Sequence, residues 1–473
     1  MFAHNRWLVL IAMTGSLAMV LVDQTVVAVA LPTIGSDLHL SPIGQQWIVN
    51  AYLLAMAAFV AIGGRLGDKF GGVVLFRAGI VIFFLASIGC GFAPTNAWGE
   101  AWMITFRALQ GIGAALMMPV SAAIVLSVFD KSSAGRAMAV YTGIGQIFLA
   151  LGPLIGGFLT EFVTWRAVFW LNIPLGIASL VLVAVSKPPN HPDRTIPISI
   201  RNAILLVVGI ATTILALQQG ASWGWTSGAT LAAAAVGIAS CTLFAMRSLH
   251  FKPPLIDLRL LADKELSTDL FIAFVLRFAI LGVALYFSMY LQDVLGMGAT
   301  RAGLALLPMA AAQLVGSQVG GWAYDKKGLR PPVLIGLGLC IVGMGYWAFA
   351  LTLLDYSLIV PALVVCGFAF GLTVPAPGTD ALAHEADVNR NQASGLLLTV
   401  RQIGGTLGVA MMGAVILSAD PLATRSPDHQ ASADATSIGF AAAACVFLVA
   451  WIAAWWLLPN TKAAGTGRTG RPQ

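Results

Sequence analysis

Residues 7–32 read WLVLIAMTGSLAMVLVDQTVVAVALP, an uncharged run interrupted by a single ionisable residue, Asp23. A helix of this length crosses a hydrocarbon core of about 30 Å at about 1.5 Å per residue. A carboxylate at such depth is costly, so it usually marks an ion or substrate pathway. The stretch therefore predicts a membrane-spanning helix that carries a candidate proton-binding residue. The alternative is a carboxylate kept neutral or paired for packing.

The composition of the whole chain extends this prediction to a polytopic membrane protein. Hydrophobic residues make up 58% of the 473 positions, charged residues make up 10%, and the mean hydropathy is +0.87. A soluble domain carries about 25% charged residues. We expect an all-α fold with fourteen spans, at residues 7–32, 46–66, 73–93, 100–128, 135–160, 166–185, 200–219, 227–246, 266–291, 300–322, 331–353, 357–380, 393–418 and 437–458.

The seventh and eighth spans are the weakest of the fourteen. Residues 230–246 read TLAAAAVGIASCTLFAM, which is rich in alanine and only weakly apolar. Twelve spans with two helices on the membrane surface is therefore an alternative. The first span resembles a signal peptide, but it is too long for one and contains Asp23. We interpret it as a retained anchor.

The distribution of Lys and Arg predicts the orientation in the membrane. With the amino terminus inside, the inner loops and tails hold 20 of the 26 basic residues. The outer loops hold Arg166, Arg301 and Arg425, and the spans hold Arg107, Arg277 and Arg401. This asymmetry follows the positive-inside rule and places both termini in the cytoplasm. The net charge of +6 then reflects topology and inner-leaflet lipid rather than nucleic-acid binding.

Metal, disulfide and nucleotide chemistry are not indicated. The five cysteines fall in apolar spans without paired spacing, and the six histidines fall in loops or tails. The phosphate-binding pattern G-x-x-x-x-G-K-[ST] does not occur. No nucleophile–base pair emerges either. We expect no cofactor, no metal and no enzymatic activity.

An internal repeat divides the chain into two related halves. Residues 64–71 (GRLGDKFG) and 321–328 (GWAYDKKG) share the pattern G-x-x-x-D-K-x-G at an offset of 257. At nearly the same offset Gln146 matches Gln402, Gly152 matches Gly408 and Gly157 matches Gly413. Parallel repeats around a midplane site are a transporter architecture. We expect an amino-terminal half at 1–185, a linker with two additional spans at 186–265, a carboxy-terminal half at 266–458 and a cytoplasmic tail at 459–473.

Six motifs in this order resemble the major facilitator superfamily, specifically its fourteen-span drug:proton antiporter family. They are LVDQTVVAVALP at 21–32, GRLGDKFGG at 64–72, RALQGIG at 107–113, GPLIGG at 152–157, WRAVFWLNIPLG at 165–176 and VRQIGGTLGVA at 400–410. One departure is Gly72-Val73, where the loop motif usually continues with basic residues. The resemblance implies a latch between the halves made by Asp68, Arg65, Lys69 and, in the repeat, Asp325. The alternative for Arg65 and Lys69 is that they follow the positive-inside rule and take no part in a latch.

The segment 152–157 has two interpretations. The resemblance implies that this segment is a hallmark of exchangers rather than of uptake systems. The residues Gly152, Gly156 and Gly157 predict close helix packing in lipid, and Pro153 predicts a kink. Glycine packing alone is the alternative.

Asp23 and Arg107 are expected to meet. Asp23 lies nine residues before Pro32, and Arg107 lies seven residues after Glu100, which gives depths of roughly 13 and 10 Å from the outer side. A neighbouring guanidinium favours the charged form of a carboxylate, whereas burial favours the neutral form. Proton and substrate would then compete for one state of the carrier. A static buried ion pair is the alternative.

The interior is expected to be net positive, since one deep carboxylate faces three arginines. Arg277 lies near mid-membrane without an acid of its own half at that depth. Arg401 lies roughly 12 Å into its span, with Asp380 as a candidate partner. A buried structural role is the alternative for Arg277. The candidate cavity residues are Arg277, Gln110, Gln146, Arg401 and Gln402.

These features predict a proton-coupled antiporter that exports small amphipathic compounds, drugs or toxic metabolites, across the cytoplasmic membrane by alternating access. We expect it to function as a monomer whose partners are its substrate, protons and the lipid bilayer. An exporter of an anionic or zwitterionic metabolite or lipid is one rival. A non-transporting membrane sensor or scaffold, which would not require Asp23, is another.

Overall fold

The computed structural model describes residues 6–129, 131–190, 192–197, 199–250, 258–374, 376–377, 380, 387–419 and 429–458. Throughout this part of the chain the regular structure is helical. The amino-terminal half contains α1 (Arg6–Asp37), α2 (Pro42–Phe70), α3 (Gly72–Gly91), α4 (Gly99–Val128), α5 (Lys131–Phe162), α6 (Trp165–Trp170) and α7 (Asn172–Ser186).

The linker contributes α8 (Ile200–Trp223) and α9 (Gly228–Ser248). The carboxy-terminal half contains η1 (Leu258–Ala262), α10 (Lys264–Met289), η2 (Tyr290–Val294), α11 (Ala299–Ala305), α12 (Leu307–Lys327), α13 (Arg330–Leu351), α14 (Tyr356–Thr373), α16 (Asp387–Ala419) and α17 (His429–Leu457). Within the described ranges these elements supply fourteen segments long and apolar enough to cross a membrane. The expected fold class is confirmed, including the seventh and eighth segments, at Ile200–Gly220 and Gly228–Ser248.

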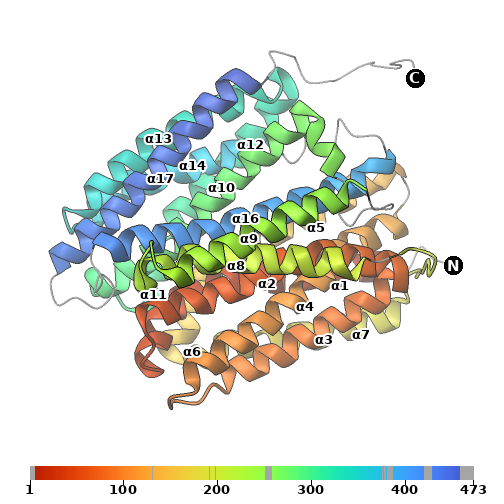
Figure 1. Cartoon of the computed structure of the whole chain (residues 1–473), viewed down its shortest axis with the longest axis horizontal. Helices are drawn as coiled ribbons and strands as arrows, with labels where there is room; N and C mark the ends of the chain where they lie inside the picture. Colours follow the sequence, from red (N-terminus) through yellow and green to blue (C-terminus); the bar gives the residue numbers. More distant parts are fainter. Residues whose placement is uncertain are drawn as a thin grey trace.

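Each half is a bundle of long, nearly antiparallel helices (Figure 1). In the amino-terminal half α4 packs against α2 and α3, while α1 packs against α5 and α7. In the carboxy-terminal half α10 packs on α16, α12 on α14, and α13 on α14 and α17. The halves meet mainly through α2 with α16, α5 with α11, and α1 with α10, and α1 also contacts α11 while α5 also contacts α12. The helices α1, α2, α10 and α16 therefore line the boundary where a midplane site would lie.

The backbones of the two halves come into close contact where α5 ends and α11 begins, which we call the far end because it lies opposite the amino terminus (Figure 1). A Cβ added to Gly157 would lie 2.4 Å from the carbonyl oxygen of Ala299, and one added to Gly303 would lie 2.3 Å from that of Pro153. The backbone N–H of Thr300 donates to Glu161 Oε2 at 2.8 Å. Small residues that permit backbone contact, together with this hydrogen bond, hold the far end together.

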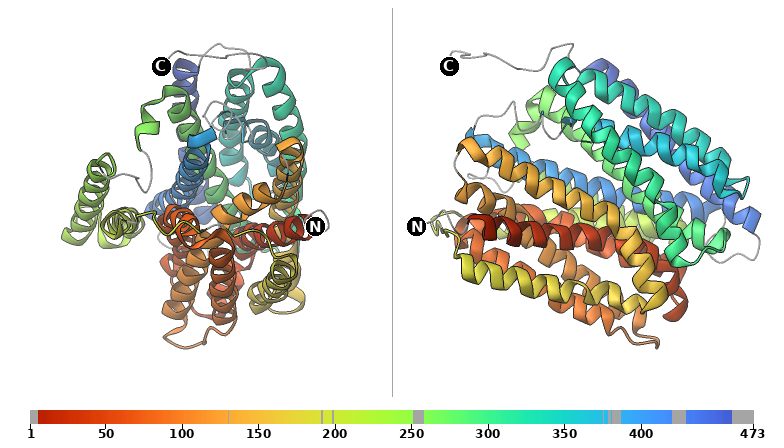
Figure 2. Two further views of the ribbon diagram at one scale, coloured as in Figure 1. Left: turned by 90° about the vertical axis from the view of Figure 1, so that its right-hand side faces the viewer. Right: turned by 180° about the vertical axis from the view of Figure 1, so that it is seen from behind.

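The linker helices lie beside the seam between the halves (Figures 1 and 2). The helices α8 and α9 pack on each other, and α8 also packs against α2 and α16. Asn50 Nδ2 on α2 donates to Gln218 Oε1 on α8 at 2.9 Å, with both side chains buried. A small cluster of buried side chains joins α8 to α2 of one half and to α10 and α16 of the other, and includes Ile62, Ile210 and Leu396. The linker thus forms two packed helices of spanning length.

Candidate functional site: a buried carboxylate and its arginine partner

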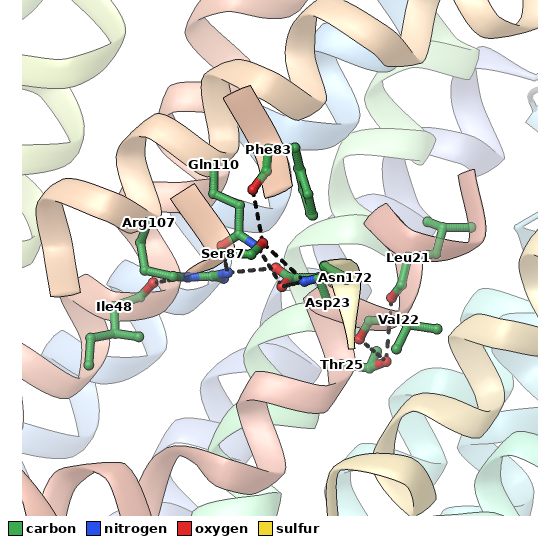
Figure 3. A network of polar contacts seen from close by, with 10 residues as sticks. All are labelled: Leu21, Val22, Asp23, Thr25, Ile48, Phe83, Ser87, Arg107, Gln110 and Asn172. Atoms are coloured by element: carbon green, nitrogen blue, oxygen red, sulfur yellow. Dashed lines mark hydrogen bonds and ion pairs between the residues drawn. The ribbon is translucent and has the colours of Figure 1, made fainter. Parts of the chain in front are cut away.

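The side chains of Asp23 on α1 and Arg107 on α4 form a buried ion pair (Figure 3). Arg107 Nη1 lies 2.5 Å from Asp23 Oδ2, and each residue is 1% exposed. The contact expected from their depths in the sequence is therefore present. Arg107 Nε also donates to the carbonyl oxygen of Ile48 at 2.9 Å, and its guanidinium lies 4.4 Å from the centre of the Tyr52 ring. The arginine is thereby fixed between α1, α2 and α4.

Three further polar side chains complete the site. Gln110 Nε2 donates to Asp23 Oδ1 at 2.8 Å, and Asn172 Nδ2 donates to the same oxygen at 3.1 Å. Both amides also donate to Ser87 Oγ, which itself donates to the carbonyl oxygen of Phe83. Figure 3 shows these side chains converging on Asp23 from α3, α4 and α7. A buried charge requires such a set of donors, because desolvation otherwise exceeds the attraction of the pair.

Asn172 and Ser87 were not predicted from the sequence. Asn172 is the first residue of α7, directly after the break in the helix at Leu171. It belongs to the motif WRAVFWLNIPLG at 165–176. The sequence feature that could have identified it is its amide side chain within an otherwise apolar span. Ser87 lies among small and apolar residues of α3, and a lone hydroxyl there carries little information. Only the packing of α3 and α7 against α1 brings both to the carboxylate.

Gln24, the next residue on α1, reaches the other half of the molecule. Arg277 Nη2 on α10 donates to Gln24 Oε1. Arg277 is partly exposed, and its charge lies within electrostatic reach of Arg401 on α16 and of Tyr52 on α2. Gln402, beside Arg401, donates to Met56 Sδ at 3.5 Å, while its buried Oε1 has no hydrogen-bond partner among the described residues. These side chains from α1, α2, α10 and α16 surround one region between the halves.

Asp23 is not the only buried carboxylate among the described residues. Asp269 on α10 is 1% exposed and Asp380 is 7% exposed, and their carboxyl groups contact each other. Tyr324 donates its hydroxyl to Asp380 Oδ1 at 2.7 Å. The described part shows no ion pair between Asp380 and Arg401, so the suggested pairing of these two is wrong. Asp380 turns instead toward α10 and α12.

The loop between α2 and α3 contacts the segment that follows α7. The carbonyl oxygen of Asp68 accepts from the backbone N–H of Asp193 at 3.0 Å, and the Asp68 side chain is exposed. The first turn of α3 is capped by Asn190 Oδ1, which accepts from Val73 N at 3.1 Å. Asn190 of the linker, rather than Asp68, therefore caps the first turn of α3. Lys69 lies near the ring of Phe70.

Some expected site residues are placed only in part. Arg65 lies within electrostatic reach of Asp68. The side chains of Asp325 and Gln146 lie outside the described residues. The latch therefore stays a prediction.

The segment 152–157 inserts α5 between α1 and α11. A Cβ on Gly152 would overlap Thr25 Oγ1, and one on Gly156 would lie 2.7 Å from the carbonyl oxygen of Val26. Thr25 Oγ1 also donates to the carbonyl oxygen of Leu149 at 3.2 Å. Gly157 and Pro153 instead face α11 of the other half. Helix α5 therefore couples α1, which carries Asp23, to the far-end contact.

Comparison with known proteins agrees with this architecture. The sequence profile of the Major Facilitator Superfamily matches residues 13–409. The chain is 30% identical to the tetracenomycin C resistance and export protein of Streptomyces glaucescens, over 93% of this chain and 81% of the relative. It is also 30% identical to the multidrug resistance protein Stp of Mycobacterium tuberculosis, over 87% and 76%, and to the methylenomycin A resistance protein of Bacillus subtilis, over 86% and 87%.

Solved structures share the fold at lower identity. A bacterial homologue of the human lysosomal transporter Spinster, in an inward-facing and unoccupied conformation, aligns with a TM-score of 0.66 at 20% identity, over 96% of this chain and 98% of that one. A D-xylose–proton symporter aligns with a TM-score of 0.65 at 16% identity, over 98% and 100%. With a profile that covers most of its length and relatives at 30% identity, the chain belongs to the Major Facilitator Superfamily.

Proposed function

We propose that this protein is a proton-coupled antiporter that exports small amphipathic compounds across the cytoplasmic membrane by alternating access. The observation that carries the proposal is the buried Asp23–Arg107 pair with its two amide donors. An intramembrane carboxylate held in this way is a functional-site candidate. The relatives support the exported class, since their names describe resistance to, or export of, antibiotics and drugs.

The proposed coupling runs through α1. A proton on Asp23 removes the charge that attracts Arg107 and weakens the hydrogen bonds from Gln110 and Asn172. Helix α1 contacts α4, α5 and α7 of its own half and α10 and α11 of the other half. A change in how α1 is held at Asp23 therefore alters the contacts across the boundary. Parallel repeats that rock about a fixed site use such a contact change to alternate access.

The conformation fits one step of this cycle. The far end is closed by α5 and α11, as the Gly157 and Gly303 contacts show. With both termini in the cytoplasm, as the basic residues predict, the far end is the outer side. We infer that Asp68, Arg65, Lys69 and Asp325 latch the inner side in the alternate state.

The test is transport in reconstituted vesicles. With the purified protein and an imposed proton gradient, amphipathic dyes and antibiotics of different charge should move against their own gradients. The dye flux should disappear when a protonophore collapses the gradient. A flux that persists without a proton gradient would refute the coupling. A protein that moves none of the compounds and acts without Asp23 would instead favour a sensor or scaffold.

One observation favours a particular charge on the substrate. Arg277 lies against α16 at Gly405, one turn after Arg401, and the described residues supply neither arginine with an acidic partner. This arrangement favours an anionic or zwitterionic metabolite or lipid as cargo.

A further inference from the structure

We propose that Arg277 and Arg401 form an anion-binding subsite between the two halves, which selects cargo bearing a carboxylate on an apolar body. The inference rests on the proposed transport function and adds the substrate's charge to it. It starts from two positive side chains that belong to different helices, α10 and α16, which pack against each other.

Both arginines belong to one surface at the boundary. The Cγ atom of Arg277 lies 3.5 Å from the position of a Cβ on Gly405, one turn after Arg401 on α16. Both arginines are partly exposed, although they lie deep in their helices. Arg277 holds one hydrogen bond, to Gln24, and Arg401 makes no hydrogen bond or ion pair with a described residue. A five-donor guanidinium with so few partners has capacity for a ligand.

Acidic side chains on the described helices around the arginines are already engaged. Asp23 is bound by Arg107, Gln110 and Asn172 on the side of α1 that faces its own half. Asp269 and Asp380 contact each other, and Tyr324 donates to the latter. Two like charges in a medium of low dielectric constant repel each other strongly. An anion placed between them would relieve that repulsion.

The surroundings suit a carboxylate attached to an apolar group. A planar guanidinium matches the geometry of a carboxylate and binds it through paired hydrogen bonds. The buried Gln402 is the neighbour of Arg401 in the chain, and its amide nitrogen contacts Met56 Sδ. Tyr52 lies within electrostatic reach of Arg277, and its fully buried ring packs against Arg107 and Phe83. Phe274 and Leu398, each three residues before one of the two arginines on the same helix, are partly exposed and supply apolar surface beside the charges.

A structural role for Arg277 makes a different prediction from ligand binding. Its bond to Gln24 joins the two halves, so its loss would lower stability and weaken the binding of every compound alike. An anion subsite instead discriminates between compounds of one shape and different charge. The test therefore needs matched ligands as well as matched variants.

The experiment measures binding to the purified full-length protein by 1-naphthylacetate, its neutral amide 1-naphthylacetamide, and the cation 1-naphthylethylammonium. The variants are Arg277→Gln, Arg401→Gln and the two charge-preserving replacements Arg277→Lys and Arg401→Lys. Arg194→Gln removes a charge from an exposed loop residue and serves as the control. Melting temperatures without ligand are recorded for all variants.

The parent should bind the carboxylate more tightly than the amide and the amide more tightly than the ammonium compound. Each Arg→Gln change should weaken carboxylate binding about tenfold, the size expected for one hydrogen bond to a charged group. The affinity for the neutral amide should stay unchanged, and the affinity for the ammonium compound should increase. The lysine variants should retain part of the preference, and Arg194→Gln should behave like the parent.

Two results would overturn the subsite. One is a parent that shows no preference for the carboxylate, and the other is an equal loss for all three compounds in the glutamine variants. Binding is measured at fixed pH without a gradient, so it does not depend on proton coupling. A failed proton-flux assay with intact carboxylate preference would refute the coupling alone, and the reverse outcome would refute the subsite alone.

Discussion

Asp23 and Gln24 are neighbours on α1, yet they bind arginines that belong to different halves of the protein. Asp23 pairs with Arg107 on α4, and Gln24 accepts a hydrogen bond from Arg277 on α10. Successive residues on a helix point about 100° apart, so one turn of α1 faces both its own half and the other. A change in the protonation of Asp23 therefore acts next to a contact that crosses the boundary.

Replacing Asp23 with Asn should abolish proton-coupled export while the protein still folds. The asparagine removes the titratable group but keeps an oxygen acceptor for Arg107, which also retains Ile48 and Gln110. Substrate-driven proton movement in vesicles should fall to that of protein-free vesicles, with a somewhat lower melting temperature. Asp37→Asn is the matched control, because Asp37 lies on the same helix and pairs with Arg166 in an exposed bridge. Normal proton movement in Asp23→Asn would contradict the assignment.

The ion pair should show strong coupling in a double-mutant cycle. Arg107→Gln alone leaves a buried carboxylate without its counter-charge, which destabilises a protein by about 3 to 5 kcal/mol. Adding Asp23→Asn removes that charge, so the double variant should melt at a higher temperature than Arg107→Gln alone. The cycle is read from melting temperatures of the parent, both single variants and the double variant. Additive losses would show that the two side chains act independently.

The far-end contact should limit how readily the protein opens there. Gly157→Val places methyl groups against the backbone of Ala299, so the helices α5 and α11 are forced apart. In a cysteine-free background, a reporter cysteine at Thr300 should then react severalfold faster with a hydrophilic maleimide. Gly303→Val, on the opposite helix, should give the same change.

Gly143→Val provides the control for this test. Gly143 lies on the same helix as Gly157, and no atom lies within 4 Å of a Cβ added there. The reporter should react at the parental rate in this variant. Unchanged labelling in Gly157→Val and Gly303→Val, with both proteins folded, would show that α5 and α11 do not separate in the cycle.

Asn172 should contribute to holding the charge of Asp23. Its loss in Asn172→Ala removes one hydrogen bond to a charged group, worth about 1.5 to 3 kcal/mol, and should lower the melting temperature and the export rate. Asn172→Asp should be worse at neutral pH, because it sets a second carboxylate against Asp23. The differences in melting temperature and export rate between Asn172→Ala and Asn172→Asp should become smaller at mildly acidic pH, where the two carboxyl groups share a proton. Differences that widen on acidification would contradict this role.

The local sequence determined the fold class and the depth of the charged residues. Hydropathy and length predicted fourteen spanning segments, and the repeat of G-x-x-x-D-K-x-G predicted two halves in one orientation. Counting residues from the ends of the spans placed Asp23 and Arg107 at similar depths, and their side chains are in contact. These features follow from the sequence because rise per residue and transfer from water are local properties.

The rotation of each helix about its axis was decided only by tertiary packing. A span that is apolar all round carries no periodic signal for which face meets which neighbour. For that reason the sequence did not reveal that Ser87 and Asn172 turn toward Asp23, that Gln24 reaches Arg277, or that Asp380 meets Asp269 rather than Arg401. Depth along the membrane normal is a property of the chain, whereas the partner at that depth is a property of helices packed together.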